Sequence, residues 1–290
     1  MPKLNTSSQS TSAMSNAVSS ESFQRTFESL FSRRRDGSRS NTFPHIVAAP
    51  IYYESGYSYP LLVWLHDAEK SELDLFDVTP RLSTRNYVTV APRGLVRQKK
   101  RVIRSIVNDR QIEEKCWFEP CNDWPSDKDS ISEAENLVFD AISEARSKYN
   151  INPRNIFILG HGTGGVMAMR IAMRYPYDFA GVVSIDGVSE SLSSLPLPSW
   201  RSHQNLPILM TVGDRRSTTV PHLSASLARL LHLYHTAGLN VLVRQYNEEG
   251  TDQDSLQARM DNVLADVNRW IMEHALPPQS PPSNFFRYAS

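Results

Sequence analysis

The stretch IFILGHGTGG, residues 156–165, decides the fold of this chain of 290 residues. Its first four residues are apolar and predict a strand that is buried on both faces. Four glycines then fall within six residues, which predicts a very tight turn in which backbone segments approach closely. Residues 166–174 follow with apolar residues at helical spacing. The stretch therefore predicts a strand that turns sharply into a helix.

The same alternation of strand and helix continues on both sides of this turn. Short apolar runs predict strands at 60–66, 87–92, 155–160, 180–185, 207–212 and 241–246. Helical patterns occur at 132–149, 166–174, 221–237 and 255–274. This order predicts an α/β fold with a mostly parallel central sheet and helices on both faces. Residues 97–129 form one long connection without clear periodicity, where we expect the ligand crevice of such a sheet.

The two ends of the chain differ in composition from its middle. Residues 1–41 are rich in Ser and poor in large apolar side chains, so we expect a disordered tail, followed by one domain at 42–275. Residues 276–290 begin with a Pro-rich run and predict an extended tail. An apolar stripe and three arginines at 23–35 could dock a protein partner, form a short helix against the domain, or serve an oligomerisation scaffold.

Charge and cysteine content narrow the classes of partner. The 31 basic and 31 acidic residues give a formal net charge of +0, which argues against a nucleic-acid partner. No apolar run is long enough to span a bilayer, and the first residues lack the pattern of a secretory signal. With only two cysteines, the sequence predicts a cytoplasmic protein without a metal or other cofactor.

The tight turn resembles the nucleophile elbow G-x-S-x-G of the α/β-hydrolase superfamily, in its phospholipase/carboxylesterase branch. The resemblance extends from about residue 60 to residue 270 and is especially close over 167–185. Three further motifs carry it: Trp64-Leu65-His66 before the oxyanion loop, Ala91-Pro92-Arg93-Gly94 at a strand end, and Cys116-Trp117 at the place of an aromatic residue beside the site. The resemblance implies the α/β-hydrolase fold.

The same resemblance implies that the catalytic residues are missing. Gly162 stands in place of the nucleophilic serine, Asp214 or Ser217 at the place of the acid, and Thr251 in place of the histidine base. Asp67 replaces the glycine that follows His66 in the oxyanion loop, where a carboxylate would oppose a forming oxyanion. We therefore expect an inactive homologue that binds a small ligand or a partner. The candidate binding residues are His66, Asp67, Trp117, His161 and Thr163.

Four other interpretations stay open at the level of sequence. Asp214, Ser217 and His222, with Asp186, could form a displaced catalytic set in an active ester hydrolase. Histidines and aspartates at strand ends (His66, Asp67, His161, Asp186 and Asp214) could bind a metal, although loop hydrogen bonds are the more common role. Cys116 and Cys121 could form a redox pair or be two free thiols, and the basic run Lys99, Lys100, Arg101 and Arg104 could hold an anion or lie in solvent.

Overall fold

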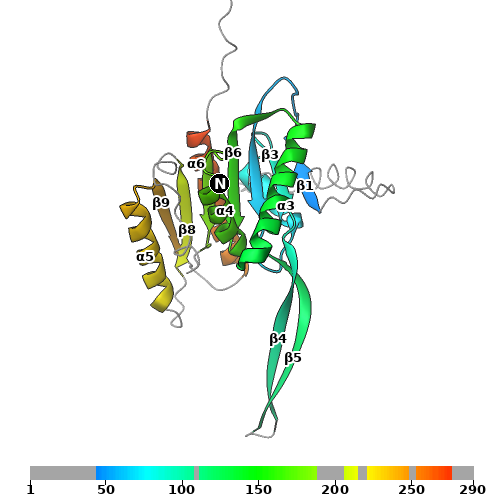
Figure 1. The fold of residues 1–290 in the computed structure, drawn as a ribbon, viewed down its shortest axis with the longest axis vertical. Coiled ribbons are helices and arrows are strands. Elements are labelled where there is room, and N and C mark those ends of the chain that lie inside the picture. Colours follow the sequence, from blue (N-terminus) through cyan, green and yellow to red (C-terminus); the bar gives the residue numbers. More distant parts are fainter. Residues whose placement is uncertain (1–43, 108–110, 188–205, 215–220, 248–252, 276–290) are drawn as a thin grey trace, which may run out of the picture. The chain divides into compact units, whose positions relative to one another are not determined.

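A seven-stranded sheet forms the centre of the protein in the computed structural model, which describes residues 44–107, 111–187, 206–214, 221–247 and 253–275 (Figure 1). The strand order is β1-β3-β2-β6-β7-β8-β9. These strands are β1 (His45–Ala48), β2 (Tyr59–Leu65), β3 (Val88–Pro92), β6 (Ile151–His161), β7 (Gly181–Ile185), β8 (Ile208–Asp214) and β9 (Val241–Asn247). Strand β1 runs antiparallel to β3, and the other neighbouring strands are parallel.

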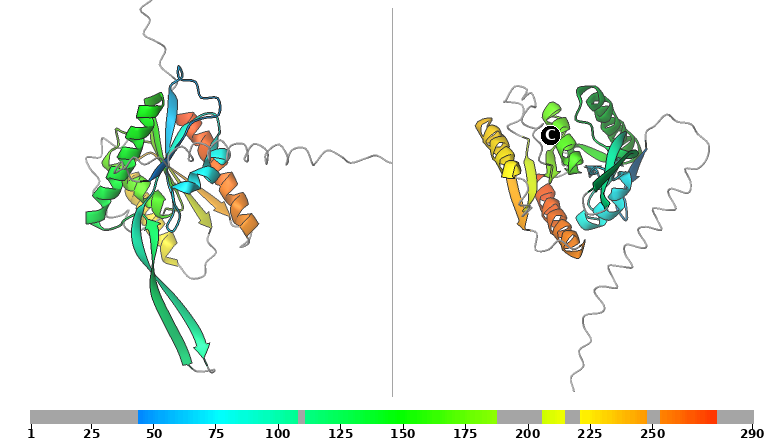
Figure 2. Two further views of the ribbon diagram at one scale, coloured as in Figure 1. Left: turned by 90° about the vertical axis from the view of Figure 1, so that its right-hand side faces the viewer. Right: turned by 90° about the horizontal axis from the view of Figure 1, so that it is seen from below.

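Helices cover both faces of this sheet (Figure 2). The helices α3 (Lys128–Lys148), α4 (Thr163–Arg174) and α5 (Pro221–Thr236) lie on one side, whereas α2 (Leu75–Leu82) and α6 (Gln253–His274) lie on the other. A short 3-10 helix, η2 (Glu72–Asp74), precedes α2. The strands β2, β3 and β7 are buried along their whole length, as the apolar runs predict for strands covered on both faces.

The predicted fold class is confirmed, although the sequence patterns did not indicate every element. The short strand β1 and the helix α2 were both missed; a strand of four residues and a helix interrupted by Pro80 give little periodicity. The other boundaries differ by a few residues, because α3 and α4 begin with polar and glycine residues that show no apolar pattern. Every described residue lies in one compact unit, Phe43–Ser290.

The long connection after β3 is not a crevice loop, so that prediction was wrong. It forms an antiparallel hairpin of β4 (Leu95–Val107) and β5 (Gln111–Asp123), each 13 residues long, in a separate two-stranded sheet. Figure 1 shows the hairpin extending away from the seven-stranded sheet. Charged residues interrupt the alternation of apolar and polar residues on both strands, which hid the strand pattern in the sequence.

Several predictions fall outside the described residues. These are the tails at 1–41 and 276–290, the docking stripe at 23–35, and the positions Ser217 and Thr251. The domain boundaries at 41 and 275 stay predictions. Within the described part of the chain, no helix is both long and apolar enough to cross a membrane.

Candidate functional site

The turn between β6 and α4 has the strained backbone of an elbow. Gly162 has φ 52° and ψ −118°, a conformation that side chains with a Cβ atom rarely adopt. Its N–H donates to the carbonyl of Ile185 at 2.8 Å, which fixes the turn above β7. Gly164 lies directly under the end of β2, where a Cβ atom would overlap the Leu65 carbonyl. The glycines therefore permit both the sharp turn and the close contact between helix and sheet.

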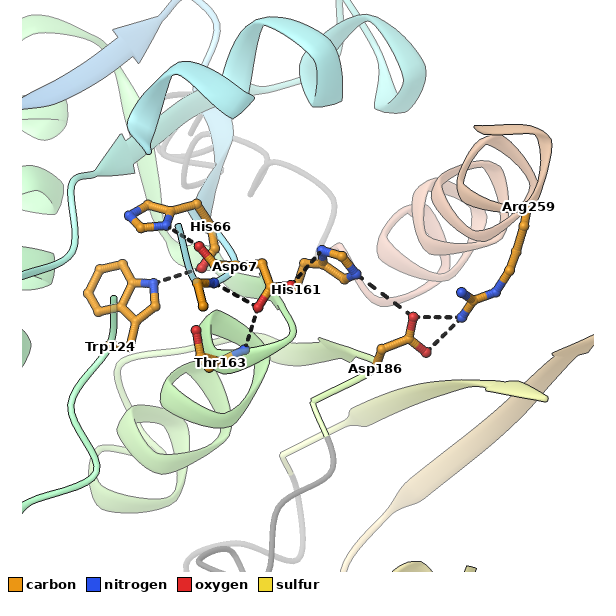
Figure 3. Close-up of polar contacts among 8 residues, drawn as sticks. His66, Asp67, Trp124, His161, Thr163, Asp186 and Arg259 are labelled. Carbon is orange, nitrogen blue, oxygen red and sulfur yellow. Dashed lines mark hydrogen bonds and ion pairs between the residues drawn. The ribbon is translucent and has the colours of Figure 1, made fainter. Parts of the chain in front are cut away.

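The Asp67 side chain occupies the space in front of Gly162 (Figure 3). Its Oδ1 accepts hydrogen bonds from the Thr163 N–H at 3.0 Å and from the Ala68 N–H at 2.7 Å. In this fold the oxyanion hole consists of the N–H after the nucleophile and an N–H of a loop that follows a sheet strand, which here is the loop after β2. Asp67 thus places its own negative oxygen between the two donors that would stabilise a reaction intermediate.

Asp67 also takes the space of the missing nucleophile side chain. A Cβ atom added to Gly162 would overlap Oδ1 and Cγ of Asp67. Gly162 itself gives the N-terminus of α4 no side-chain cap, and the carboxylate of Asp67 supplies one from another loop. A negative charge at a helix N-terminus is stabilised by the helix dipole and the free N–H groups. The Asp67 side chain therefore fits the space that Gly162 leaves, and its charge is stabilised by the N-terminus of α4.

His66 holds this loop from behind and is completely buried. Its Nδ1 lies 2.7 Å from the Asp67 carbonyl, and its Nε2 accepts from the Gly94 N–H at 2.9 Å. These partners require a neutral ring with the proton on Nδ1. Burial lowers the pKa of His66, which favours the same neutral form. Both ring nitrogens of His66 are thus engaged with the backbone.

Trp124 is the aromatic residue beside the site, and sequence reasoning missed it. Its Nε1 donates to the His66 carbonyl at 2.8 Å, and its ring packs on the His66 ring at 5.4 Å between centroids. Trp124 is buried at the end of the hairpin, directly after β5. The sequence did offer one signal for an aromatic residue at this place: Trp124 stands next to Pro125, just before the helix that packs on the sheet.

His161 lies between two carboxylates at the carboxyl ends of the strands. Its Nδ1 is 3.8 Å from Asp67 Oδ2, and its Nε2 is 3.8 Å from Asp186 Oδ2. Asp186 has a positive φ of 52° and follows β7, so its side chain turns back toward β6. The imidazole therefore connects the occupied oxyanion hole to a second acidic group.

Arg259 on α6 completes the arrangement and was also missed, because nothing in the helical pattern distinguishes it from other polar positions. Its Nη2 donates to both carboxylate oxygens of Asp186 at 2.7 and 2.6 Å, and the Gly213 N–H donates to Oδ1 at 2.8 Å. Burial alone would raise the pKa of Asp186. The nearby His161 imidazole, the hydrogen bonds and charge of Arg259, and the Gly213 N–H outweigh burial and lower the pKa to about 2.

Trp117 does not lie at the elbow, so its placement beside the site was wrong. It lies six residues along β5 from the base of the hairpin, about 20 Å away at ~3.3 Å per residue. Its Nε1 donates to Glu119. Cys116 and Cys121 are both free thiols. They are five residues apart on one strand and therefore face opposite sides of the ribbon, so the redox pair was wrong.

The basic run at 99–104 lies on β4 rather than in a crevice loop. Lys99 and Arg101 both form ion pairs with Glu69, which follows the Asp67 loop, and Arg101 also pairs with Glu119 at 3.0 Å. These two cations therefore connect the hairpin to the loop that contains Asp67. An anion site built on them would first have to displace these carboxylates.

The metal and displaced-triad alternatives gain no support from the described residues. No group of three or more metal-ligating side chains occurs there, since His66 is committed to the backbone and Asp186 to Arg259. Asp214 ends β8 opposite Asn247, and His222 lies in the first turn of α5. Their side chains, like Ser217, lie outside the described part of the structure.

The fold and the elbow together define an α/β-hydrolase. The model of the Phospholipase/Carboxylesterase family matches residues 112–271, and the chain belongs to this family. A comparison with curated protein sequences found no match.

Solved structures of esterases are similar to this chain in fold. The carboxylesterase of Bacillus cereus is 15% identical, covers 80% of this chain and 94% of its own, and has a TM-score of 0.54. The acyl-protein thioesterase 2 of Zea mays is 16% identical, covers 80% and 99%, and has a TM-score of 0.51. At these identities the likeness concerns the fold.

Proposed function

We propose that this chain is a non-hydrolytic member of the phospholipase/carboxylesterase family that acts by binding a ligand or a protein partner. One observation carries the proposal: the Asp67 carboxylate accepts the Thr163 and Ala68 N–H groups at 3.0 and 2.7 Å, in the oxyanion hole, against Gly162. The hole is thus filled by an anion that belongs to the protein itself.

The chemistry of ester hydrolysis supports this proposal. The reaction needs an attacking side chain and two free donors for the negative oxygen that forms at the carbonyl. Glycine offers no attacking atom, and both donors are already used by a carboxylate. Removal of one oxyanion donor in a working enzyme costs about 10²–10³ in rate. When the Asp67 carboxylate occupies the hole, neither donor is free. The carboxylate also adds a negative charge at the place where the oxygen of the substrate would become negative during the reaction.

The carboxyl edge of the sheet supports the binding part of the proposal. The side chains of Asp67 and His161 are 34% and 29% exposed, so a ligand can reach them from solvent. Asp186 is only 12% exposed and is held by Arg259, which makes this part of the edge rigid. A rigid acidic edge with one imidazole favours a ligand or partner that donates hydrogen bonds or carries positive charge.

The test of hydrolysis compares four proteins: the natural chain, Gly162→Ser, Asp67→Gly and the double variant. Each is incubated with p-nitrophenyl esters and with a fluorophosphonate probe that labels activated serines. We expect no turnover and no labelling in any of them. Turnover or labelling of the natural chain would favour the alternative, an ester hydrolase with displaced catalytic residues, and would refute the proposal.

Occupancy of the hole is tested by chemical rescue. Asp67→Gly frees the two N–H groups, and we expect acetate to bind there and raise the melting temperature of this variant. The matched control is Asp67→Asn, which keeps a side-chain oxygen in the hole and should not respond to acetate beyond the natural chain. An Asp67→Gly variant as stable as the natural chain and indifferent to acetate would contradict the assignment.

The binding role is tested by thermal shift of the natural chain against panels of amines, cationic peptides and neutral metabolites. We expect at least one class to stabilise the protein, with the shift reduced in Asp67→Asn and His161→Gln. A shift that survives both substitutions would place the ligand elsewhere and contradict the proposed site.

A further inference from the structure

A cavity lies near the amino ends of β2 and β6, at residues that the proposed function does not use. Its volume is about 440 Å³, within the ~300–1,000 Å³ that is typical of small-molecule sites. Tyr59 at the start of β2 and Asn155 on β6 line it from the sheet, and both are buried. Strand β2 spans about 20 Å, at ~3.3 Å per residue, before it ends at the loop that contains Asp67. The cavity is therefore separate from the elbow.

The loop before β2 forms one wall of this cavity with Glu54 and Tyr57. The Glu54 N–H donates to the Tyr59 hydroxyl at 3.2 Å, and the Tyr57 N–H donates to the Glu54 carbonyl at 3.1 Å. The ring of Tyr57 packs edge-on against the ring of Tyr59, with 4.6 Å between the ring centroids. These contacts hold the loop in a defined turn at the cavity.

The loop before β3 forms a second wall with Arg85 and Asn86. The backbone N–H groups of these two residues both donate to Ser83 Oγ at 3.2 Å. The Ile51 N–H donates to the Thr84 carbonyl at 2.7 Å and so joins this loop to the loop before β2. The two walls are therefore connected through the backbone, which favours a preformed site.

The end of α6 supplies an apolar wall. Met272 and Ala275 line the cavity there, and Asn86 Nδ2 lies 3.9 Å from Met272 Sδ. Met272 is 52% exposed and Tyr57 is 42% exposed. A thioether and an aromatic ring both make favourable contacts with a second aromatic ring. The cavity therefore offers the ring of a ligand two large side chains that solvent reaches.

Two opposite charges line the same cavity. Glu54 contributes a carboxylate, and Arg85 contributes a guanidinium group. Among the residues that the structure describes, neither of these side chains forms an ion pair. A ligand can therefore pair with both charges without displacing a partner, whereas an anion at Lys99 and Arg101 would have to displace Glu69.

We propose that this cavity binds a small zwitterion with an aromatic ring, which is an aromatic amino acid or a dipeptide that contains one. The carboxylate of such a ligand pairs with Arg85, whose planar guanidinium group can donate two parallel hydrogen bonds to it. The ammonium group of the ligand pairs with Glu54. Its ring packs on Tyr57 and Met272.

The pair of charges selects a zwitterion over a ligand with one charge. A carboxylate without an ammonium group would gain Arg85 but would also meet the negative charge of Glu54, and an amine without a carboxylate would meet the reverse. Both side chains are exposed, so each ion pair contributes modestly. We therefore expect a dissociation constant of about 0.1–5 mM.

The first experiment uses the natural chain and follows ligand binding by saturation-transfer difference NMR up to about 10 mM ligand. The zwitterions are phenylalanine and glycyl-phenylalanine. The comparison ligands are phenylpropionate, which lacks the ammonium group, phenethylamine, which lacks the carboxylate, and alanine, which lacks the ring. We expect at least one zwitterion to bind at least about threefold more tightly than all three comparison ligands. The tighter zwitterion identifies the amino acid or the dipeptide as the preferred class.

The second experiment repeats the titration of that zwitterion with three variants of the cavity. Arg85→Met and Glu54→Gln should each raise its dissociation constant at least about threefold, because each removes one of the two charges. Tyr57→Ala should raise it about fivefold, because it removes the ring on which the ligand packs. All three side chains are exposed, and equal melting temperatures of the variants exclude a loss of folding as the cause.

Matched control variants change the same residue types outside the cavity. Arg146→Met and Glu133→Gln alter exposed residues of α3, and Tyr177→Ala removes a ring that is 83% exposed. Asp67→Asn alters the elbow. Each of these four variants should leave the dissociation constant within about 1.5-fold of the natural chain.

Three results would overturn the proposal. One is the absence of binding of either zwitterion at about 10 mM. The second is an affinity for phenylpropionate or phenethylamine equal to that for the zwitterion. The third is binding that Arg85→Met and Glu54→Gln leave unchanged; if Asp67→Asn weakens it, the ligand lies at the elbow, which would support the proposed function and refute this site. A preference for the zwitterion that depends on both Glu54 and Arg85 would support the proposal.

Discussion

The substitution Gly162→Ser, which would rebuild the elbow of an active esterase, should instead destabilise the protein. The elbow residue has φ 52° and ψ −118°, and a residue with a Cβ atom held in such a conformation costs about 1–3 kcal/mol. The new Cβ would also overlap the Asp67 carboxylate and push it from the Thr163 and Ala68 N–H groups. Hydrogen bonds to a charged group contribute about 1.5–3 kcal/mol each. Hydrogen bonds between water and the displaced Asp67 carboxylate compensate for part of this loss.

Together these effects predict a loss of about 3–5 kcal/mol in the free energy of unfolding. At roughly 2–4 °C per kcal/mol for a domain of this size, the melting temperature should fall by about 6–20 °C. The measurement is urea denaturation and thermal unfolding followed by circular dichroism. Gly162→Ala should show nearly the same loss, because the clash begins at Cβ. Gly56→Ser should cost little, because a Cβ atom at Gly56 has nothing within 4 Å.

A double-mutant cycle isolates the clash. Asp67→Gly removes the same hydrogen bonds and should cost about 2–4 kcal/mol. If serine at 162 acts by displacing Asp67, the double variant should be less destabilised than the sum of the single variants by about 2 kcal/mol. Additive losses, or a Gly162→Ser protein as stable as the natural chain, would refute the steric coupling.

Three further predictions concern the residues around the elbow. Arg259→Met leaves the Asp186 carboxylate buried without its cation and should lower the free energy of unfolding in urea by about 3 kcal/mol, with partial recovery in the double variant with Asp186→Asn. Because the pKa of Asp186 is lowered to about 2, its contribution of about 2 kcal/mol should be present above pH ~4 and lost between pH ~4 and ~2; Asp186→Asn should lack this loss, and an identical pH profile would contradict the assignment. Trp124→Phe removes the donor to the buried His66 carbonyl and should cost about 1–3 kcal/mol in thermal unfolding, whereas Trp117→Phe on the exposed hairpin should cost less than about 0.5 kcal/mol.

Sequence reasoning predicted the sheet because its strands are buried on both faces. Continuous apolar runs such as those of β2 and β6 leave few alternatives, and the glycines at 160–165 fix where the chain turns. The hairpin was missed because its strands are held by charges paired across the ribbon. In the sequence these residues appear only as charged positions, because the sequence does not show which residue each one pairs with across the ribbon.

The resemblance names positions of the candidate site but not the contacts that the side chains make there. The resemblance identifies two separate substitutions: an aspartate at 67 where the family has glycine, and a glycine at 162 where the family has serine. It does not show that the first fills the space of the second, because that contact joins residues 95 positions apart. Arg259 was missed for the same reason, since its partner Asp186 lies 73 positions away.

The contact between Asp67 and Gly162 also bears on the proposal that the chain does not hydrolyse esters. A serine at 162 requires space that Asp67 fills, so the serine alone is opposed by a clash. A glycine at 67 alone leaves two N–H groups without the acceptor that they have now. Each change is unfavourable without the other, and both together still lack a histidine at position 251. The contact that stabilises the elbow is therefore the one that the proposed function places in the oxyanion hole, and under that proposal stability opposes each single change toward a serine esterase.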